Sequence, residues 1–378
     1  MDIEKALTEH FDGKSKIKVN KFNYENLFIP QPDEVNWSLG FNPTIRTSVN
    51  TISKLLDIPA PVSNSTLDNF HRIGVASTSA IKVYEFLFKQ LDVPEPILKE
   101  VISRKPISSF DYTAVWDLNV HIIQPIIEPI YPNSYLMKFL RDRVEVEKSA
   151  LQNTKKKTTP HEKGIEYIHH TLQNTQLTQA ELEYLISLIP SLVELNSISD
   201  LTYDDRKSLI TYKLDFYLSL IAAIDVTIIN KWLSEHGDKF ELPDCGIFGE
   251  IFRCEGKCHF EQFLRYIAAI TEVKIGSLAV HIEIERNDTG QGVTLDEAKK
   301  NRLKEWRKGK TKPTFPTLLS FLENAVTAGA YDFSIAGSLC IMLDRYKAGL
   351  NDSCWGELIN IDYYVKHYEF HLNKAAGD

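Results

Sequence analysis

The sequence has few cysteines and no apolar run long enough to cross a bilayer. Five cysteines in 378 residues exclude a small secreted scaffold held together by disulfides. The most apolar long window, 214–229, contains Asp215 and Asp225 and is too short and too charged for a membrane-spanning helix. The N-terminus carries acids where a signal peptide has its basic region. We therefore expect a cytoplasmic protein without membrane association.

The short motifs that identify common enzyme classes are also missing. GxGxxG, GxxxxGK[ST], HEXXH and Gly-x-Ser-x-Gly do not occur in the sequence. Dinucleotide binding, P-loop binding and the commonest hydrolase arrangements therefore have no support, and an enzyme of unrecognised type is our third hypothesis.

The overall charge limits how the protein can meet other molecules. A formal net charge of −8 argues against binding a polyanion over the whole surface. Hydrophobic residues make up 43% of the chain and charged residues 25%, which is typical of a globular protein with substantial cores. Any contact with nucleic acid must therefore come from a local basic surface.

Helical periodicity and helix start signals dominate the second half of the chain. Thr178 with Glu181 and Thr294 with Glu297 have the spacing of capping boxes. A long helix with apolar residues on most of its circumference should run from about Asp204 to Gly237. We predict a mostly α protein of two helical domains with at most a short strand pair. Residues 16–22 are expected to form a small strand or an extended arm, and residues 278–286 a strand or the end of a helix.

Residues 154–164, TKKKTTPHEKG, form the most polar and basic break in the chain. We therefore expect an N-terminal helical domain over 1–153, a linker or loop over 154–164, and a C-terminal helical domain over 165–378.

The densest positive charge lies in the segment 299–312. It holds eight basic residues and one acid, Glu305, which gives a local charge of +7. The basic residues, which are the candidate nucleic-acid contacts, are Lys299, Lys300, Arg302, Lys304, Arg307, Lys308, Lys310 and Lys312. Each one that neutralises a phosphate releases counterions and so favours binding. Trp306 either stacks on a base or anchors the helix to the core. A solvated helix face and a docking surface for an acidic protein remain the alternatives.

The same region carries a family resemblance. Leu303, Trp306, Gly309, Pro313 and the leucines after it have the order found at the end of a recognition helix and the helix that follows. Residues 293–326 thus resemble the Cro/repressor-type helix-turn-helix family. The resemblance implies DNA binding through the helix that ends at Trp306. It departs from the family upstream, where the tight turn expected around 297–299 is replaced by continuous helix.

A second candidate site lies in a cysteine-rich segment. Cys245, Cys254, Cys258 and His259 offer four soft ligands within fifteen residues, which is the number that structural zinc requires. Their spacing fits no common zinc motif, and small buried apolar residues are the alternative interpretation.

From these patterns we expect a regulatory protein that binds nucleic acid through a basic helix, in a bacterial defence, phage or plasmid setting. The alternative is a helical scaffold for a protein partner or for self-association, without nucleic acid. Zinc is the one cofactor that the sequence suggests.

Overall fold

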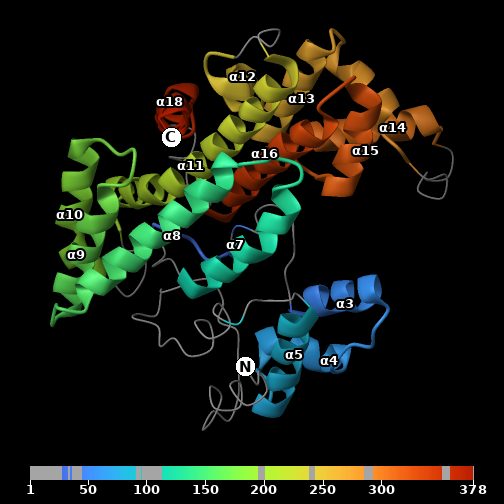
Figure 1. The fold of residues 1–378 in the computed structure, drawn as a ribbon. Helices are drawn as coiled ribbons and strands as arrows, with labels where there is room; N and C mark the ends of the chain where they lie inside the picture. Colours follow the sequence, from blue (N-terminus) through green and yellow to red (C-terminus); the bar gives the residue numbers. More distant parts are fainter. Residues whose placement is uncertain are drawn as a thin grey trace. The chain divides into compact units, whose positions relative to one another are not determined.

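The described part of the protein is helical and contains no β-strand. The computed structural model describes residues 28–32, 35, 45–90, 95, 113–194, 201–237, 243–284, 293–350 and 358–377 (Figure 1). The predicted mostly α fold is confirmed. Of the two alternatives at 278–286, a strand or a helix end, the strand is wrong for the residues described there, because a 3-10 helix, η3 (Ile275–His281), occupies the first half of the segment. The candidate strand at 16–22 lies outside the described residues.

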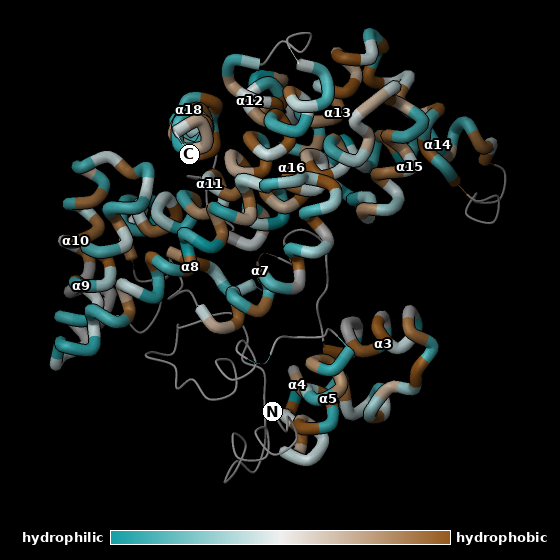
Figure 2. The backbone as a smooth tube through the Cα atoms, viewed as in Figure 1, coloured by the Kyte–Doolittle hydropathy of each residue, from teal (hydrophilic) through white to brown (hydrophobic). Residues whose placement is uncertain are grey.

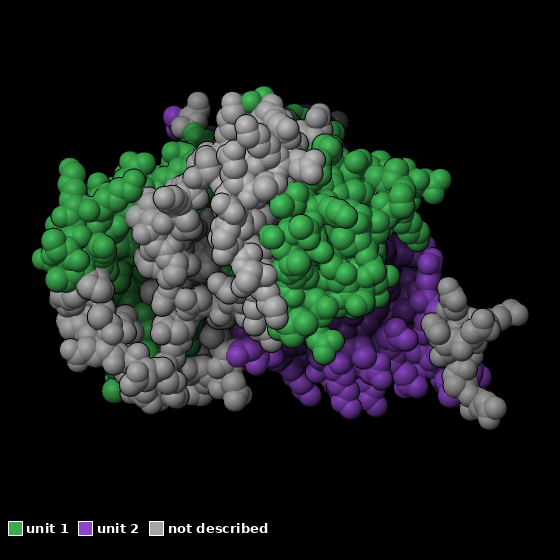
Figure 3. Space-filling model, turned by 90° about the horizontal axis from the view of Figure 1, so that it is seen from below, with its two compact units in different colours: residues 1–37, 42–216 green, residues 38–41, 217–378 purple. Residues whose placement is uncertain are grey.

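The chain divides into two compact units, coloured separately in Figure 3. Unit 1 comprises 1–37 and 42–216, and unit 2 comprises 38–41 and 217–378. The linker or loop expected at 154–164 lies within unit 1. There, the chain makes a short turn and begins a new helix, which is fixed by a capping box between Thr159 and Glu162 and packs against the helix before the turn. The described residues of this polar, basic segment therefore connect two packed helices.

The first three described helices of unit 1 share a hydrophobic cluster of their own. They are α3 (Ile45–Leu56), α4 (Asn64–Arg72) and α5 (Ser77–Gln90). Gly74 lies in the turn between α4 and α5 with a φ of 78°, a conformation that glycine adopts without strain. The cluster between these helices consists of Val49, Leu67, Phe70, Val75, Ala80, Val83 and Phe88.

The remaining described helices of unit 1 follow in sequence order, and the first four of them pack each against the next. They are α7 (Thr113–Ile127), α8 (Tyr135–Thr154), α9 (Pro160–Leu172), α10 (Gln179–Glu194) and the first part of α11 (Tyr203–His236). The predicted capping of α10 is present, since Thr178 Oγ1 accepts from the Glu181 amide and the Glu181 carboxylate accepts from the Thr178 amide.

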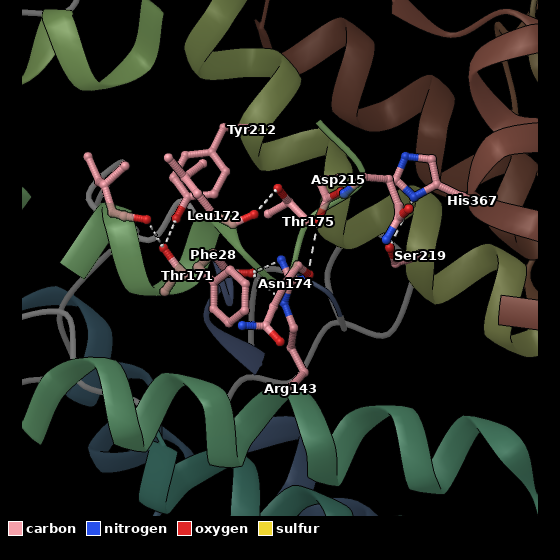
Figure 4. A network of polar contacts seen from close by, with 12 residues as sticks. Phe28, Arg143, Thr171, Leu172, Asn174, Thr175, Tyr212, Asp215, Ser219 and His367 are labelled. Atoms are coloured by element: carbon pink, nitrogen blue, oxygen red, sulfur yellow. Dashed lines mark hydrogen bonds and ion pairs between the residues drawn. The ribbon is translucent and has the colours of Figure 1, made fainter. Parts of the chain in front are cut away.

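A buried polar network ties unit 1 together around Arg143 of α8 (Figure 4). The guanidinium donates to the Phe28 carbonyl at 2.8 Å, the Asn174 carbonyl at 3.2 Å and Asp215 Oδ2 at 3.1 Å. Asp215 Oδ1 accepts from the Gln176 amide at 2.7 Å. Protein donors and acceptors thus replace part of the hydration of the two charges, which makes a buried charge pair tolerable in a helical core.

Unit 2 is built from the second part of α11 and the helices that follow it. These are α12 (Gly246–Arg253), α13 (His259–Ile270), η3, α14 (Leu295–Arg307), α15 (Phe315–Ala325), α16 (Ala330–Leu350) and α18 (Ile361–Ala376). Figure 2 shows hydrophobic and hydrophilic residues alternating along these helices, as expected of amphipathic elements around a shared core. A buried hydrogen bond between Ser219 and His367 lies within this unit (Figure 4).

Helix α11 matches the long helix expected from about Asp204 to Gly237. By length and composition alone it could span a membrane, but 72% of its most apolar window is buried inside the protein. It carries buried Lys213, Asp215 and Asp225. These properties are those of a central core helix.

Two buried aspartates each accept hydrogen bonds from the first amides of a neighbouring helix in unit 2. Asp225 of α11 accepts from the amides of Ile247 and Phe248 in α12 at 3.1 and 3.0 Å, and from the Tyr364 hydroxyl at 2.8 Å. Burial raises the pKa of Asp225 to about 6, against the opposing influence of these hydrogen bonds. The carboxylate is therefore ionised at neutral pH and satisfies amides that have no partner inside α12.

Asp344 of α16 has the same role for α13. Its Oδ1 accepts from the His259 amide at 2.8 Å, and its Oδ2 accepts from the Phe260 amide at 3.2 Å. The His259 ring also lies against it, with 2.9 Å between Nδ1 and Oδ1. Because this contact fixes where α13 begins, it also fixes the side chains that α13 contributes to the site described next.

Candidate functional site

Helix α14 is held at both ends by local signals and in the middle by two buried side chains. Thr294 and Glu297 form the predicted capping box at its start. At its end Gly309 has a φ of 66°, and the amides of Gly309 and Lys310 donate to the carbonyls of Trp306 and Glu305, which is a Schellman motif. This arrangement leaves the polar face of the helix in a fixed orientation.

Trp306 anchors α14 to the core of unit 2. Its side chain is 1% exposed and lies edge-on to Phe260 and Phe321, with ring centroids 6.3 and 5.7 Å away. Leu303 is buried beside it. The alternative in which Trp306 stacks on a nucleic-acid base is therefore wrong, because no base can reach the ring.

The eight basic residues of 299–312 fall into two groups. Four are exposed, namely Lys300, Lys304, Lys308 and Lys310. The other four, Lys299, Arg302, Arg307 and Lys312, are half-buried. Among the described residues, only Arg307 of the eight forms an ion pair with an acid, through Glu261 at 2.9 Å.

Two of the half-buried lysines have local roles. Lys299 Nζ donates to the Val280 carbonyl at 2.9 Å and so joins α14 to η3. Burial lowers the pKa of Lys312, and the nearby carboxylate of Asp344 acts in the opposite direction. These two side chains support the packing of unit 2, while the four exposed lysines face solvent.

A cavity of about 790 Å³ lies between α13, η3 and α14. We call it the basic cleft. Its charged lining consists of six basic side chains and one carboxylate, Glu261. The basic side chains are Lys257, Arg265, Lys300, Lys304, Arg307 and Lys308. Lys300, Lys304 and Lys308 are spaced four residues apart and so lie along one face of α14. A concentration of positive charge at a concave surface is therefore present in an otherwise acidic protein.

Glu261 holds two of the arginines at the cleft. Its Oε1 accepts from Nε and Nη2 of Arg307 at 3.1 and 2.9 Å and from Nη2 of Arg265 at 3.3 Å. Its Oε2 accepts from the Lys257 amide at 3.0 Å. Glu261 is 2% exposed, so these donors replace its hydration.

The pKa of Glu261 reflects this arrangement. Desolvation, the largest single influence, raises the pKa of Glu261. The hydrogen bond from the Lys257 amide and the contacts with Arg307 and Arg265 together lower it by more, so the pKa lies below its usual value. The carboxylate is therefore charged at neutral pH. Its stabilising contribution is present above its ordinary pKa and is lost as the pH falls through the depressed value.

The candidate zinc ligands do not gather into one site. Cys245 is buried, with Sγ 3.1 Å from Glu250 Oε1, and Cys258 Sγ lies 3.9 Å from the Arg307 carbonyl oxygen. Cys254 lies at the end of α12, and His259 is paired with Asp344. Within the described ranges, no three His, Cys, Asp or Glu side chains form a group that could hold a metal. Zinc stays a prediction that metal analysis of the purified protein would test.

Comparison with known proteins gives no match. No protein-family model fits the chain, and no curated protein or solved structure is similar to it. The resemblance to the helix-turn-helix family therefore rests on the residues of 293–326 alone, and the site must be interpreted from its own geometry.

Three lining residues were not found from the sequence. Lys257, Glu261 and Arg265 lie in a stretch where acids and bases alternate, so the segment shows no excess of charge. The four-residue spacing of Glu261 and Arg265 was an available signal for an ion pair on one helix. No local pattern indicated that Glu261 would also meet Arg307, 46 residues later.

Proposed function

We propose that the protein binds nucleic acid at the basic cleft of unit 2. The observation that carries this proposal is the exposed lysine row of α14, Lys300, Lys304 and Lys308, along one wall of a cavity with six basic side chains. Because only Arg307 of the eight basic residues pairs with an acid among the described residues, most of this charge remains available to a ligand.

The affinity should come from contacts between the basic side chains of the cleft and the phosphate groups of the nucleic-acid backbone. Neutralising a phosphate with a lysine or arginine releases condensed counterions, so binding weakens as salt is added. The lining side chains in the described chain include no aromatic residue, and Trp306 is buried, so a stacking platform for bases does not contribute. We therefore expect binding with little preference for base sequence.

The resemblance to the helix-turn-helix family supports the same proposal in part. The helix pair α14 and α15, with Gly309 between them, has the order that the resemblance implies for a recognition helix and its successor. The described element before α14 is η3, a short 3-10 helix. With this function we also propose the regulatory role and the cytoplasmic, bacterial setting expected from the sequence.

The direct test is the salt dependence of oligonucleotide binding. With about 0.7 counterions released per contact on a single strand, four lysine contacts predict a slope of log affinity against log salt of about −3. Affinity should therefore fall about 50-fold between about 50 and 200 mM salt. Fluorescence anisotropy of a labelled single strand with the full chain measures both quantities.

A charge-reversal variant locates the effect. The triple variant Lys300→Glu, Lys304→Glu and Lys308→Glu should bind too weakly to measure at the lower salt concentration. The matched control reverses three exposed lysines of unit 1, Lys155, Lys156 and Lys163. It has the same net charge as the first variant and should keep most of the affinity. Equal losses in the two triple variants would show that total charge, and not the cleft, controls binding.

An acidic protein partner is the second candidate function. Val280 of η3 is 65% exposed and lines the basic cleft, and Leu295 at the start of α14 is 41% exposed. An acidic segment with apolar residues would match this combination of charge and exposed apolar surface. Absence of oligonucleotide binding at low salt, with the protein folded, would favour this candidate over nucleic acid.

A further inference from the structure

The arginines of the basic cleft differ from its lysines in how they are held. Arg265 and Arg307 come from different helices, and both donate to the same oxygen of the buried Glu261 carboxylate. The lysines Lys300, Lys304 and Lys308 are exposed along the face of α14. The cleft therefore has a fixed part, made of two guanidinium groups, and an outer row of long, exposed side chains.

Both guanidiniums keep donors that the carboxylate does not use. Arg307 bonds Glu261 through Nε and Nη2, which leaves Nη1, and Arg265 bonds it through Nη2, which leaves Nη1 and Nε. Arg265 Nε is buried and has no hydrogen-bond partner among the described residues, so solvent and ligands do not reach it in this conformation. The Nη1 groups of Arg265 and Arg307 are therefore the donors left for a ligand in the basic cleft.

We propose that Arg265 and Arg307 form a subsite for a phosphate monoester, the terminal phosphate of a nucleic-acid strand, and that Glu261 is its positioning residue. This inference rests on the proposed nucleic-acid binding and names the part of the strand that enters the cleft. Two guanidiniums, together with Lys257 and Lys304 in the same lining, suit a group of high negative charge.

The charge and the size of the cleft both favour a strand end over the interior of a strand. A terminal phosphate carries about −1.5 to −2 at pH 7, whereas an internal phosphodiester carries a single charge. The cavity of about 790 Å³ is in the range of sites that enclose a small ligand. It can hold the last nucleotide or two of a strand, with the chain continuing along the lysine row of α14.

Binding of one oligonucleotide in three forms tests the subsite. The full chain is titrated with the same single strand bearing a 5′-phosphate, a 3′-phosphate or hydroxyls at both ends. One phosphorylated end should bind about tenfold more tightly than the hydroxyl form, as expected when charge-assisted hydrogen bonds are added. Equal binding of the three forms overturns the subsite and leaves the proposed function standing.

Two variants distinguish the effect of the guanidinium geometry from the effect of the net charge of the basic cleft. Arg265→Lys keeps the positive charge but removes the planar donor fork, and should abolish the preference for the phosphorylated end. Glu261→Gln makes the cleft more positive by one charge, so charge alone predicts tighter binding of the phosphorylated strand. Loss of the fixed guanidinium geometry predicts instead that the tenfold preference falls while the hydroxyl strand binds as well as before. Arg253→Lys, on the exposed Arg253 of α12, is the matched control and should keep the preference.

Competition by inorganic pyrophosphate tests whether the subsite binds a small phosphorylated molecule instead of a strand end. Inorganic pyrophosphate should compete with the phosphorylated strand and have less effect on the hydroxyl strand. Binding of pyrophosphate without binding of any oligonucleotide would assign the subsite to a small phosphorylated molecule and overturn the strand-end assignment. A preference for the phosphorylated end that survives in both Arg265→Lys and Glu261→Gln, each confirmed as folded by its melting curve, would also overturn it.

Discussion

Replacing Arg143 with methionine lowers the free energy of unfolding of unit 1 by about 3–5 kcal/mol, the range for breaking a buried ion pair. Arg143 is 4% exposed and donates to the Phe28 and Asn174 carbonyls as well as to Asp215. The substitution removes the positively charged partner of the buried Asp215 carboxylate, whose Oδ1 still accepts from the Gln176 amide. Amide hydrogen exchange in α8 and α9 measures the free energy of opening in this unit.

An exposed ion pair in the same unit provides the matched control. Arg46 pairs with Asp68 at 2.8 Å, with both side chains about half exposed to solvent. Arg46→Met should lower the free energy of unfolding of unit 1 by no more than about 1 kcal/mol, because water solvates the two exposed charges almost as well as they stabilise each other. Similar effects of Arg46→Met and Arg143→Met on the exchange rates would contradict the role given to the buried network.

Replacing Gly246 with alanine should destabilise unit 2 by about 3 kcal/mol, combining an unfavourable backbone conformation with an overpacked site. Gly246 has a φ of 72°, and an added Cβ would collide with Asp225 Oδ2 and approach the Tyr368 ring to 2.8 Å. Asp225 cannot move away without losing its hydrogen bonds to the Ile247 and Phe248 amides. Hydrogen exchange of the α12 amides, with thermal melting of the full chain, measures the loss.

Gly309→Ala separates the two contributions. Gly309 has a similar φ of 66°, but no atom lies within 4 Å of the position that its Cβ would take. This substitution should lower the free energy of unfolding of unit 2 by only about 1–2 kcal/mol, the cost of a left-handed backbone conformation for alanine. If Gly246→Ala and Gly309→Ala lower the stability of unit 2 equally, the close contact with Asp225 is not important for packing.

The features that the sequence predicted well are those encoded by neighbouring residues. The start of α14 at the Thr294 and Glu297 capping box and the start of α10 at the Thr178 and Glu181 pair both depend on side chains three positions apart. Helix ends of this kind are decided by local hydrogen bonds, so a pattern of residue types is enough to find them.

The features that were missed depend on contacts between distant parts of the chain. The composition of 154–164 leaves a linker and a loop as alternatives, and it does not indicate that α8 and α9 pack together across this segment. Trp306 could be assigned to the core only once Phe260 and Phe321 were placed around it. The same holds for the cleft, because Lys257 and Arg265 join the lysines of α14 only through the packing of α13.

The most direct test of nucleic-acid binding at the basic cleft is protection of individual lysines from acetylation, measured by mass spectrometry with and without a single-stranded oligonucleotide. The account predicts that Lys300, Lys304 and Lys308 lose reactivity when the strand is bound, while the equally exposed Lys155, Lys156 and Lys163 of unit 1 keep theirs. Unchanged reactivity of the α14 lysines at a strand concentration that saturates binding, or protection of the unit 1 lysines in their place, would contradict it.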